Sequence, residues 1–238
     1  LTESNELLEQ YAHLASHDLR SPIQNIINFS DLLKRRLKDK LSTDELEFIN
    51  YISEASQRLK QTTSDLLKVA TIQHQELNLK WCDPKQILEE VLEDLEEKII
   101  ATKARIEIAN FPDSIKIDQH TIHLVFQNLI ANSLKFAKEG EVPKIEIGYE
   151  ETADQHAFIF QDDGIGIAEA DQAHIFKLFR RVNEEGQYEG TGMGLAICLR
   201  MIRRLHGDIE VQSQLGKGST FKIEVPKQSV HSNLRITL

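Results

Sequence analysis

The first third of the chain carries apolar residues at helical spacing. From residue 19, and again from residue 48, they recur at alternating intervals of four and three, which is the repeat of a coiled-coil seam. The two sets are Leu19, Ile23, Ile26, Ser30, Leu33 and Leu37, then Phe48, Ile52, Ala55, Leu59, Thr62, Leu66 and Val69. Between them Ser42, Thr43 and Asp44 are candidate helix N-caps. The pattern predicts two long helices, over residues 1–37 and up to about residue 74, joined as an antiparallel hairpin.

A single helical hairpin cannot enclose a hydrophobic core. We therefore expect a homodimer in which two hairpins form a four-helix bundle. The alternative is a monomer whose hairpin packs against the downstream residues, which is less favoured because the apolar stripes run along the full hairpin. Pro22 lies inside the first helix and is expected to bend it.

Beyond the hairpin the pattern changes to short strands alternating with helices. After a linker at residues 73–81, a helix is expected from Asp83-Pro84 to residue 99. Further helices are predicted from the cap Asp118 to about 137, at 170–179, and from 194 to Gly207, a candidate C′ glycine. Predicted strands lie at 105–109, 115–117, 144–149, 157–161, 208–213 and 220–225. The fold class is thus a helical hairpin followed by an α/β sandwich, with helices on one face of a mixed sheet.

Composition is compatible with two folded units. The chain has 238 residues, of which 40% are hydrophobic, enough for one ordinary core and a smaller element. We expect a hairpin domain at 1–78, an α/β domain at 79–226 and a loose tail at 227–238. Because residue 1 opens directly on a helical pattern without a cap, we expect the sequence to be the C-terminal part of a longer protein.

Charge and cysteine content indicate which kinds of partner the chain can bind and in which compartment it is found. The net charge of −10 disfavours binding to nucleic acid and to anionic membranes. Two cysteines, Cys82 and Cys198, form no disulfide framework and fit a reducing, cytoplasmic location. No apolar run is long enough to span a bilayer and no signal peptide is present, so this portion is expected to be soluble, whatever anchor a longer protein carries.

A histidine, an acid and a hydroxyl lie within little more than one helical turn at the N-terminal end. His17 and Ser21 lie about 40° apart around the predicted helix, on one face. An imidazole held in water near neutral pH can act as a nucleophile or proton carrier, and Asp18 can take its proton. An exposed histidine is most often simply solvated, so this assignment depends on the rest of the chain.

Two further groups of residues suit a nucleotide. Asn128, Asn132 and Lys135 recur at i, i+4 and i+7 on one helix face, where amide oxygens can ligate Mg²⁺ and an ammonium can neutralise phosphate. Glycines then follow a predicted strand and open a predicted helix, where backbone N–H groups can reach phosphate. These segments comprise Asp162, Gly164 and Gly166, and then Gly190, Thr191, Gly192, Gly194 and Leu195. Each segment alone is weak support for a site.

Together, in this order, the motifs resemble the transmitter region of two-component sensor histidine kinases. Residues 16–23 (SHDLRSPI) resemble the H box, and 128–136 (NLIANSLKF) the N box. Asp162, Gly164 and Gly166 match the first glycine box, Phe176 and Phe179 the F box, and residues 190–195 (GTGMGL) the second glycine box. The resemblance covers residues 1–225 and implies a dimerisation and phosphotransfer hairpin followed by a Bergerat-type ATP-binding domain.

The resemblance also implies a role for each residue. His17 would attack the γ-phosphoryl group of ATP, with Asp18 as general base. Asn132 would ligate Mg²⁺, Asn128 and Lys135 would contact phosphates, and Asp162 would bind the adenine amino group. The remaining nucleotide-binding positions would be Gly164, Gly166, Phe179, Arg180, Gly190, Thr191, Gly192, Gly194 and Leu195, with residues 181–189 as a lid that orders on ATP binding.

Partners and departures from the family pattern follow from the same likeness. A response-regulator receiver domain would dock near residues 21–28 and accept the phosphoryl group on an aspartate. Ser21 stands where the family more often has threonine or asparagine, which leaves a phosphatase activity open. Ser133 and Asp163 replace the commoner alanine and asparagine.

Three other functions compete with this one. Gyrase, MutL and related ATPases share the nucleotide fold, but they use a glutamate to activate water where this chain has Asn128, an amide that cannot act as a base. A serine kinase of the mitochondrial type would not need His17. A non-catalytic dimerisation scaffold would be expected to have lost one of the motif residues, and none is lost.

Overall fold

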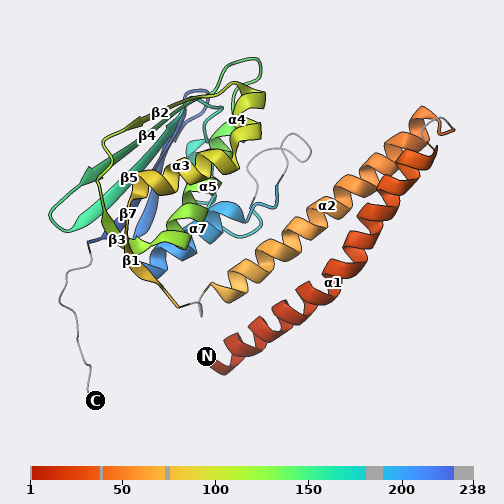
Figure 1. Cartoon of the computed structure of the whole chain (residues 1–238), viewed down its shortest axis with the longest axis horizontal. Coiled ribbons are helices and arrows are strands. Elements are labelled where there is room, and N and C mark those ends of the chain that lie inside the picture. The colour runs from red at the N-terminus through yellow and green to blue at the C-terminus, as the bar shows by residue number, and fades with distance from the viewer. Residues whose placement is uncertain (1, 38–39, 73–75, 181–189, 228–238) are drawn as a thin grey trace.

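Two long helices form a hairpin that extends beyond a layered α/β unit in the computed structural model (Figure 1). The structure describes residues 2–37, 40–72, 76–180 and 190–227, and for residues 2–18 and Arg20 the backbone alone. Helix α1 spans Thr2–Leu37 and α2 spans Thr43–Thr71. Of the three candidate caps, Ser42 is the one used: its side chain accepts from the Glu45 N–H while Glu45 reaches back to the Ser42 N–H, a capping box. The predicted hairpin is confirmed.

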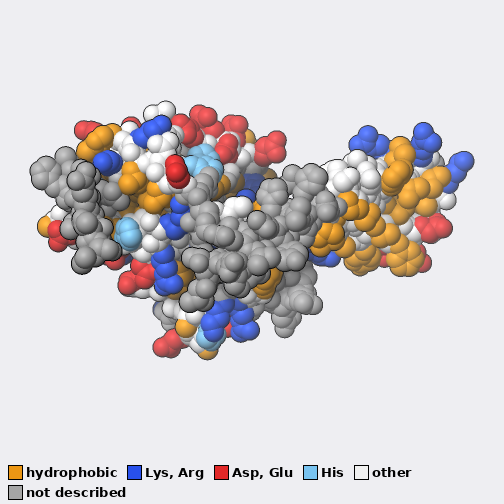
Figure 2. Space-filling model, turned by 90° about the horizontal axis from the view of Figure 1, so that it is seen from below, with side chains coloured by type: hydrophobic (Ala, Val, Ile, Leu, Met, Phe, Trp, Pro, Cys, Tyr) orange, Lys and Arg blue, Asp and Glu red, His pale blue; other side chains and the backbone are white. Residues whose placement is uncertain are grey.

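The hairpin buries few of its apolar side chains. Ile23, Ile27 and Ser30 of α1 are buried against Ser53 and Ser56 of α2. Most of the predicted seam stays 39–64% exposed, along with neighbouring apolar residues, and Figure 2 shows hydrophobic side chains gathered on the hairpin. These exposed residues, the apolar stripe, are Leu19, Ile26, Phe29, Leu32, Leu33, Phe48, Tyr51, Ile52, Leu59 and Leu66. Within the described residues the α/β unit therefore does not cover the stripe.

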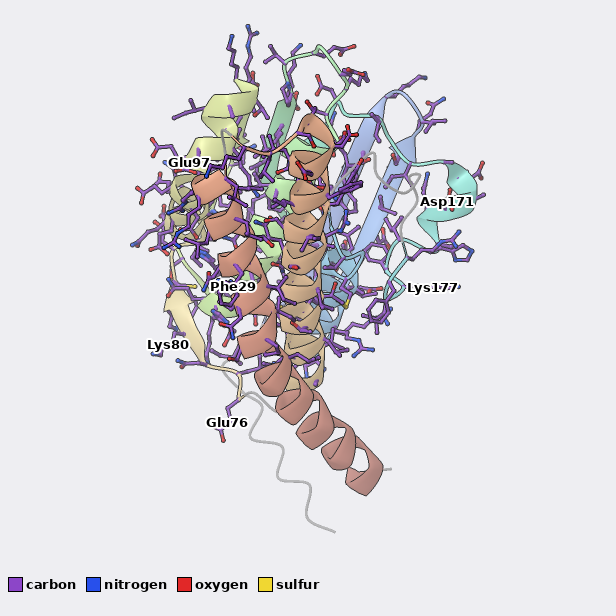
Figure 3. The ribbon with its side chains drawn as sticks, turned by 90° about the vertical axis from the view of Figure 1, so that its right-hand side faces the viewer. Phe29, Glu76, Lys80, Glu97, Asp171 and Lys177 are labelled. Carbon is purple, nitrogen blue, oxygen red and sulfur yellow. The ribbon has the colours of Figure 1, made fainter. Side chains whose placement is uncertain are left out.

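Helix α1 is bent. It contains Pro22, and Figure 3 shows its N-terminal part leaning away from α2. A proline ring removes one backbone hydrogen bond and crowds the preceding turn, which bends a helix at that point. None of the helices in the described ranges combines the length and apolar content needed to cross a bilayer.

A mixed five-stranded sheet forms the base of the α/β unit. Its order is β2-β4-β5-β7-β6, and every pair is antiparallel except β2 with β4. The strands are β2 (Arg105–Ala109), β4 (Lys144–Glu151), β5 (Gln155–Asp162), β6 (Asp208–Gln214) and β7 (Gly218–Pro226). Helices α3 (Pro84–Asp94), α4 (Glu96–Thr102), α5 (Gln119–Lys135) and α7 (Gly194–Arg204) cover one face (Figure 1). This confirms the predicted α/β layer.

The core lies between that face and the helices. Along β4, Ile145 and Ile147 are buried while Lys144 and Glu146 are exposed, the alternation of a sheet with one covered face. Phe126 of α5 packs on the sheet, and its ring centre lies 5.1 Å from that of Phe158 and 5.0 Å from that of Phe160. All three phenylalanines are at most 1% exposed.

Several predicted boundaries were wrong. Residues 79–81, expected in the linker, belong to β1 (Leu79–Cys82), which pairs antiparallel with β3 (Ile115–Asp118). The helix predicted over 83–99 is two helices, because the backbone leaves helical geometry at Leu95. The helix predicted at 170–179 is a single turn, α6 (Glu169–Gln172). Such ends depend on tertiary contacts that periodicity does not report.

The end of α7 also differs from the prediction. Gly207 was expected to take the left-handed C′ position, but His206 takes it, with φ of 60°. Gly207 follows, and its N–H donates to the Ile202 carbonyl, completing a Schellman motif. A side chain at Gly207 would collide with the backbone of Glu224, so close packing explains this glycine. The tail beyond residue 227 lies outside the described residues.

The Phe126 contacts predict a large effect on stability. Phe126→Ala should lower the free energy of unfolding of the α/β unit by about 3–5 kcal/mol, because it leaves a cavity among buried rings. Chemical denaturation monitored by circular dichroism would measure the change. Trp81→Ala, at a side chain 67% exposed, is the aromatic control and should change stability little. Similar losses in both variants would contradict this account of the core.

Candidate functional site

The face of α5 that the sequence singled out lies beside the second glycine segment. Asp118 caps the helix, accepting from the Thr121 N–H at 2.8 Å, and the apolar side of α5 is buried on the sheet. This orientation leaves Asn128, Asn132 and Lys135 half-buried on the other side. Two amides and an ammonium on one rigid helix can bind a phosphate chain and a hard cation.

The loop entering α7 packs tightly against this face of α5. A methyl group at Gly190 would lie 2.9 Å from Lys135 Nζ, and one at Gly194 would collide with Asn128 Oδ1. Gly190 and Gly192 also have positive φ, of 138° and 71°, which favours glycine. We call residues 190–194 the phosphate loop. It brings the N-terminus of the eleven-residue helix α7 to the polar face of α5.

Asp162 ends β5 with its carboxylate held in place. Its Oδ1 accepts from the N–H groups of Gly164 at 3.0 Å and Ser219 at 3.2 Å. Its Oδ2 lies 3.4 Å from Ser133 Oγ, which is also placed to donate to the Leu129 carbonyl at 3.2 Å. Burial raises the pKa of the Asp162 carboxyl, while these three hydrogen bonds lower it and so oppose the effect of burial. The carboxylate can therefore accept a further bond from a ligand in a fixed direction.

Of the groups that bind Asp162, Ser133 could be noticed in the sequence and the Ser219 N–H could not. Ser133 stood out as a departure from the family pattern, without an assigned role. Ser219 was not identified, because its backbone N–H reaches Asp162 only through the antiparallel pairing of β5 with β7. A backbone donor of this kind carries no residue signature.

The first glycine segment has a steric role in the site. Ile165 donates its N–H to the Phe136 carbonyl at 3.0 Å, which holds the turn after β5 against the end of α5. A methyl group at Gly164 would lie 2.5 Å from that same carbonyl oxygen. Gly166 has φ of 69°, and a side chain there would collide with the Gln214 carbonyl. These glycines allow three backbone segments to meet beside Asp162.

The residues of the F box lie at the rim. Phe176 packs against the core, whereas Phe179 is 57% exposed with φ of 61°. Arg180 donates to Asp171 of α6 at 3.4 Å, and Asp171 is labelled in Figure 3. The predicted lid, residues 181–189, lies outside the described residues. Leu195 lies in the first turn of α7 and packs partly against the core.

The remaining predicted residues lie on the hairpin. His17, Asp18 and Ser21 are all in α1, and Ser21 is exposed. Lys60 Nζ donates to Gln24 Oε1 at 2.9 Å, so residue 24 of α1 lies level with residue 60 of α2. Because the two helices are antiparallel, two residues lie level when their numbers add to about 84. His17 is therefore level with the part of α2 near residue 67. That part of α2 lies against α7 (Figure 1).

Comparison with protein families identifies both parts of the chain. Residues 7–75 match the His Kinase A (phospho-acceptor) domain. Residues 117–229 match the histidine kinase-, DNA gyrase B- and HSP90-like ATPase family. Together with the hairpin and the α/β fold, these matches show that the chain belongs to the histidine kinases and carries their transmitter region, including its ATP-binding domain.

Individual relatives agree with this assignment. The chain is 36% identical over 226 residues to the phytochrome-like protein Cph1 of Synechocystis sp., covering 95% of this chain and 30% of that protein. It is 30% identical to the sensor protein EvgS of Escherichia coli O157:H7, covering 93% of this chain and 19% of that protein. The chain thus spans less than a third of the length of these relatives.

Solved structures share the fold. Full-length ShkA in complex with AMPPNP superposes with a TM-score of 0.71 at 24% identity, covering 95% of this chain and 47% of that one. The histidine kinase AdeS of Acinetobacter baumannii gives a TM-score of 0.64 at 25% identity, covering 90% and 98%. ThkA in complex with the response regulator TrrA also gives 0.64 at 24% identity, covering 95% and 64%.

The raised pKa of Asp162 predicts a pH-dependent stability difference. The folded carboxyl binds its proton more tightly than the unfolded one, so wild-type stability falls as pH rises from the ordinary value of 3.8 through the raised pKa. Asp162→Asn has no carboxyl at this position, so its stability does not fall for this reason. The free energy of unfolding of the variant minus that of wild type should therefore increase over this pH range.

Denaturation at a series of pH values measures this difference. Glu146→Gln, at an exposed position of β4, controls for the removal of one acidic group. A difference between Asp162→Asn and wild type that stays constant with pH would contradict the prediction.

Proposed function

We propose that this chain transfers the γ-phosphoryl group of ATP to His17 and then to an aspartate of a response-regulator receiver domain. The contact of the phosphate loop with the Asn128 and Lys135 side chains carries the proposal. In support of the proposal, this contact joins the N-terminus of α7 to an amide and an ammonium of α5, and Asp162 would bind the base. A domain that only held two chains together would not need this arrangement.

ATP would be bound along α5 and the phosphate loop. Asp162 would accept a hydrogen bond from the adenine amino group, since its Oδ1 is already held by two N–H groups. Asn128 and Lys135 would contact the phosphates, and the first N–H groups of α7 would face them. The amide oxygen of Asn132 suits Mg²⁺, which would neutralise charge on the phosphate chain.

Phosphoryl transfer needs a nucleophile and a base on the hairpin. One imidazole nitrogen of His17 would form the bond to the γ-phosphorus while the bond to the ADP oxygen breaks. Asp18 would take the proton from the other ring nitrogen, and ADP would leave with the electron pair. The docking of α7 near residue 67 of α2, level with His17, supports this step.

A receiver domain would dock on the hairpin beside Ser21. A groove of about 410 Å³ lies between the helices, lined by Gln24, Ile27, Gln57, Lys60, Gln61 and Ser64. Its polar walls begin within one turn of Ser21, whose hydroxyl would position water for removal of the phosphoryl group. The response regulator bound to ThkA, a protein of the same fold, supports this class of partner.

The apolar stripe supports a homodimer. Ten large side chains on α1 and α2 are 39–64% exposed, and a second copy would bury them in a four-helix bundle. On this proposal residues 1–78 dimerise and carry the phosphoryl group, residues 79–226 bind ATP, and 227–238 form a tail. Because ATP and receiver domains are cytoplasmic, we place this region in the cytoplasm.

Labelling with γ-labelled ATP and Mg²⁺ tests the proposed reaction. Wild type should gain a protein-bound label that acid removes and alkali does not, and His17→Gln should lose it entirely, because amide nitrogen is not nucleophilic. Label retained in the variant would contradict His17 as the acceptor. Free phosphate without labelled protein would instead favour ATP hydrolysis.

The dimer predicts a specific effect of a charge in the stripe. Ile52→Lys should shift the chain from dimer to monomer in sedimentation velocity, because the ammonium would be buried in the seam of two hairpins. Glu54→Lys, two residues away on the polar side of α2, should leave the dimer intact. A monomeric wild type, or equal sedimentation of all three proteins, would exclude this interface.

A further inference from the structure

An acidic side chain of the hairpin is buried against the phosphate loop. Asp65 of α2 is 6% exposed, although Leu66 and Lys68 on the same helix are exposed. Its Oδ2 accepts a hydrogen bond from Thr191 Oγ1 at 2.7 Å, between residues 126 positions apart. Its Oδ1 accepts from Gln61 Nε2 at 2.9 Å and lies 3.8 Å from Lys68 Nζ. Each carboxylate oxygen of Asp65 therefore accepts a hydrogen bond, and one of the two donors belongs to the phosphate loop.

Apolar packing beside this hydrogen bond holds the two parts together. Val69 and Ile72, one and two turns beyond Asp65, are 8% and 4% exposed and belong to the core of the α/β unit. Figure 1 shows the end of α2 lying against α7, which the phosphate loop precedes. The hydrogen bond to Thr191 therefore lies at the edge of an apolar contact, where it adds direction to the docking.

This contact has a consequence for the nucleotide. The hydroxyl of Thr191 can donate one hydrogen bond, and here it donates that bond to Asp65. Thr191 lies between Gly190, next to Lys135, and Gly194, next to Asn128, so the Asp65 carboxylate stands beside the proposed phosphate site. A carboxylate repels the phosphates of ATP, and the docked hydroxyl is unavailable to them.

We infer that Asp65 is a positioning residue of the hairpin, which holds the phosphate loop through Thr191 and thereby lowers the affinity of the chain for ATP. Docking of α2 and binding of the triphosphate oppose each other, so ATP releases the loop from the hairpin by the same factor by which docking weakens ATP binding. This inference rests on the proposed function, because it requires the loop to bind phosphate. The residue acts on the nucleotide from outside the α/β domain.

Calorimetric titration of the whole chain with Mg²⁺ and AMPPNP tests the inference. Asp65→Ala should bind the analogue about five-fold more tightly or better, within the usual range for coupled sites. Asp65→Asn keeps an acceptor for Thr191 but loses the charge, so its affinity should fall between those of wild type and Asp65→Ala. Glu54→Gln removes an exposed acid eleven residues away on α2 and should match wild type, because salt screens charges at that distance.

Repeating the Asp65→Ala comparison in a Thr191→Val variant separates the effect of the Asp65–Thr191 hydrogen bond from the effect of the Asp65 charge. In Thr191→Val the hydroxyl is gone, so adding Asp65→Ala should bring a clearly smaller gain in affinity than in the wild-type background, because only the repulsion by the carboxylate is left to remove. The same gain in both backgrounds would overturn the inference, as would unchanged or weaker binding by both Asp65 variants in the wild-type background. Absence of AMPPNP binding by every protein, wild type included, would instead reject the proposed function. Circular dichroism spectra matching wild type would confirm that the variants fold.

Discussion

Close approach of the phosphate loop to α5 is the constraint on which the site depends. The loop reaches Asn128 and Lys135 because Gly194 and Gly190 have no side chains to keep it away. Helix α5 can present those residues because its other side, with Phe126, is buried on the sheet. The same core that stabilises the domain thus fixes the direction of its polar groups, and a shift of α5 would separate the amides from the loop.

The hairpin is stabilised differently from the α/β unit. Its helices bury small residues such as Ser30, Ser53 and Ser56 between them and leave the apolar stripe outside. Such a hairpin is stable only when something covers the stripe, whereas the α/β unit has its own core. On the proposed function, this division of stability would let the hairpin dimerise while the α/β unit changes its position on α2.

Asp162 and Asp65 are both largely buried acids, but different contacts hold them. Asp162 is held by backbone N–H groups inside the domain, so the fold of that domain fixes the direction of its carboxylate. Asp65 is buried only because two units meet, and its partner Thr191 belongs to the other unit. The first set of contacts lies within one unit, whereas the second joins the two units.

By itself the sequence determined the hairpin, the α/β class, and the residues on one face of α5, because these depend on periodicity within single elements. It missed β1, whose partner β3 lies more than thirty residues away, and it extended α6 because a polar turn can share helical spacing. It placed the left-handed residue at Gly207 rather than at His206. Only the tertiary structure showed the Ser219 N–H on Asp162 and Asp65 on Thr191, since such contacts depend on strand register and docking, which local patterns do not encode.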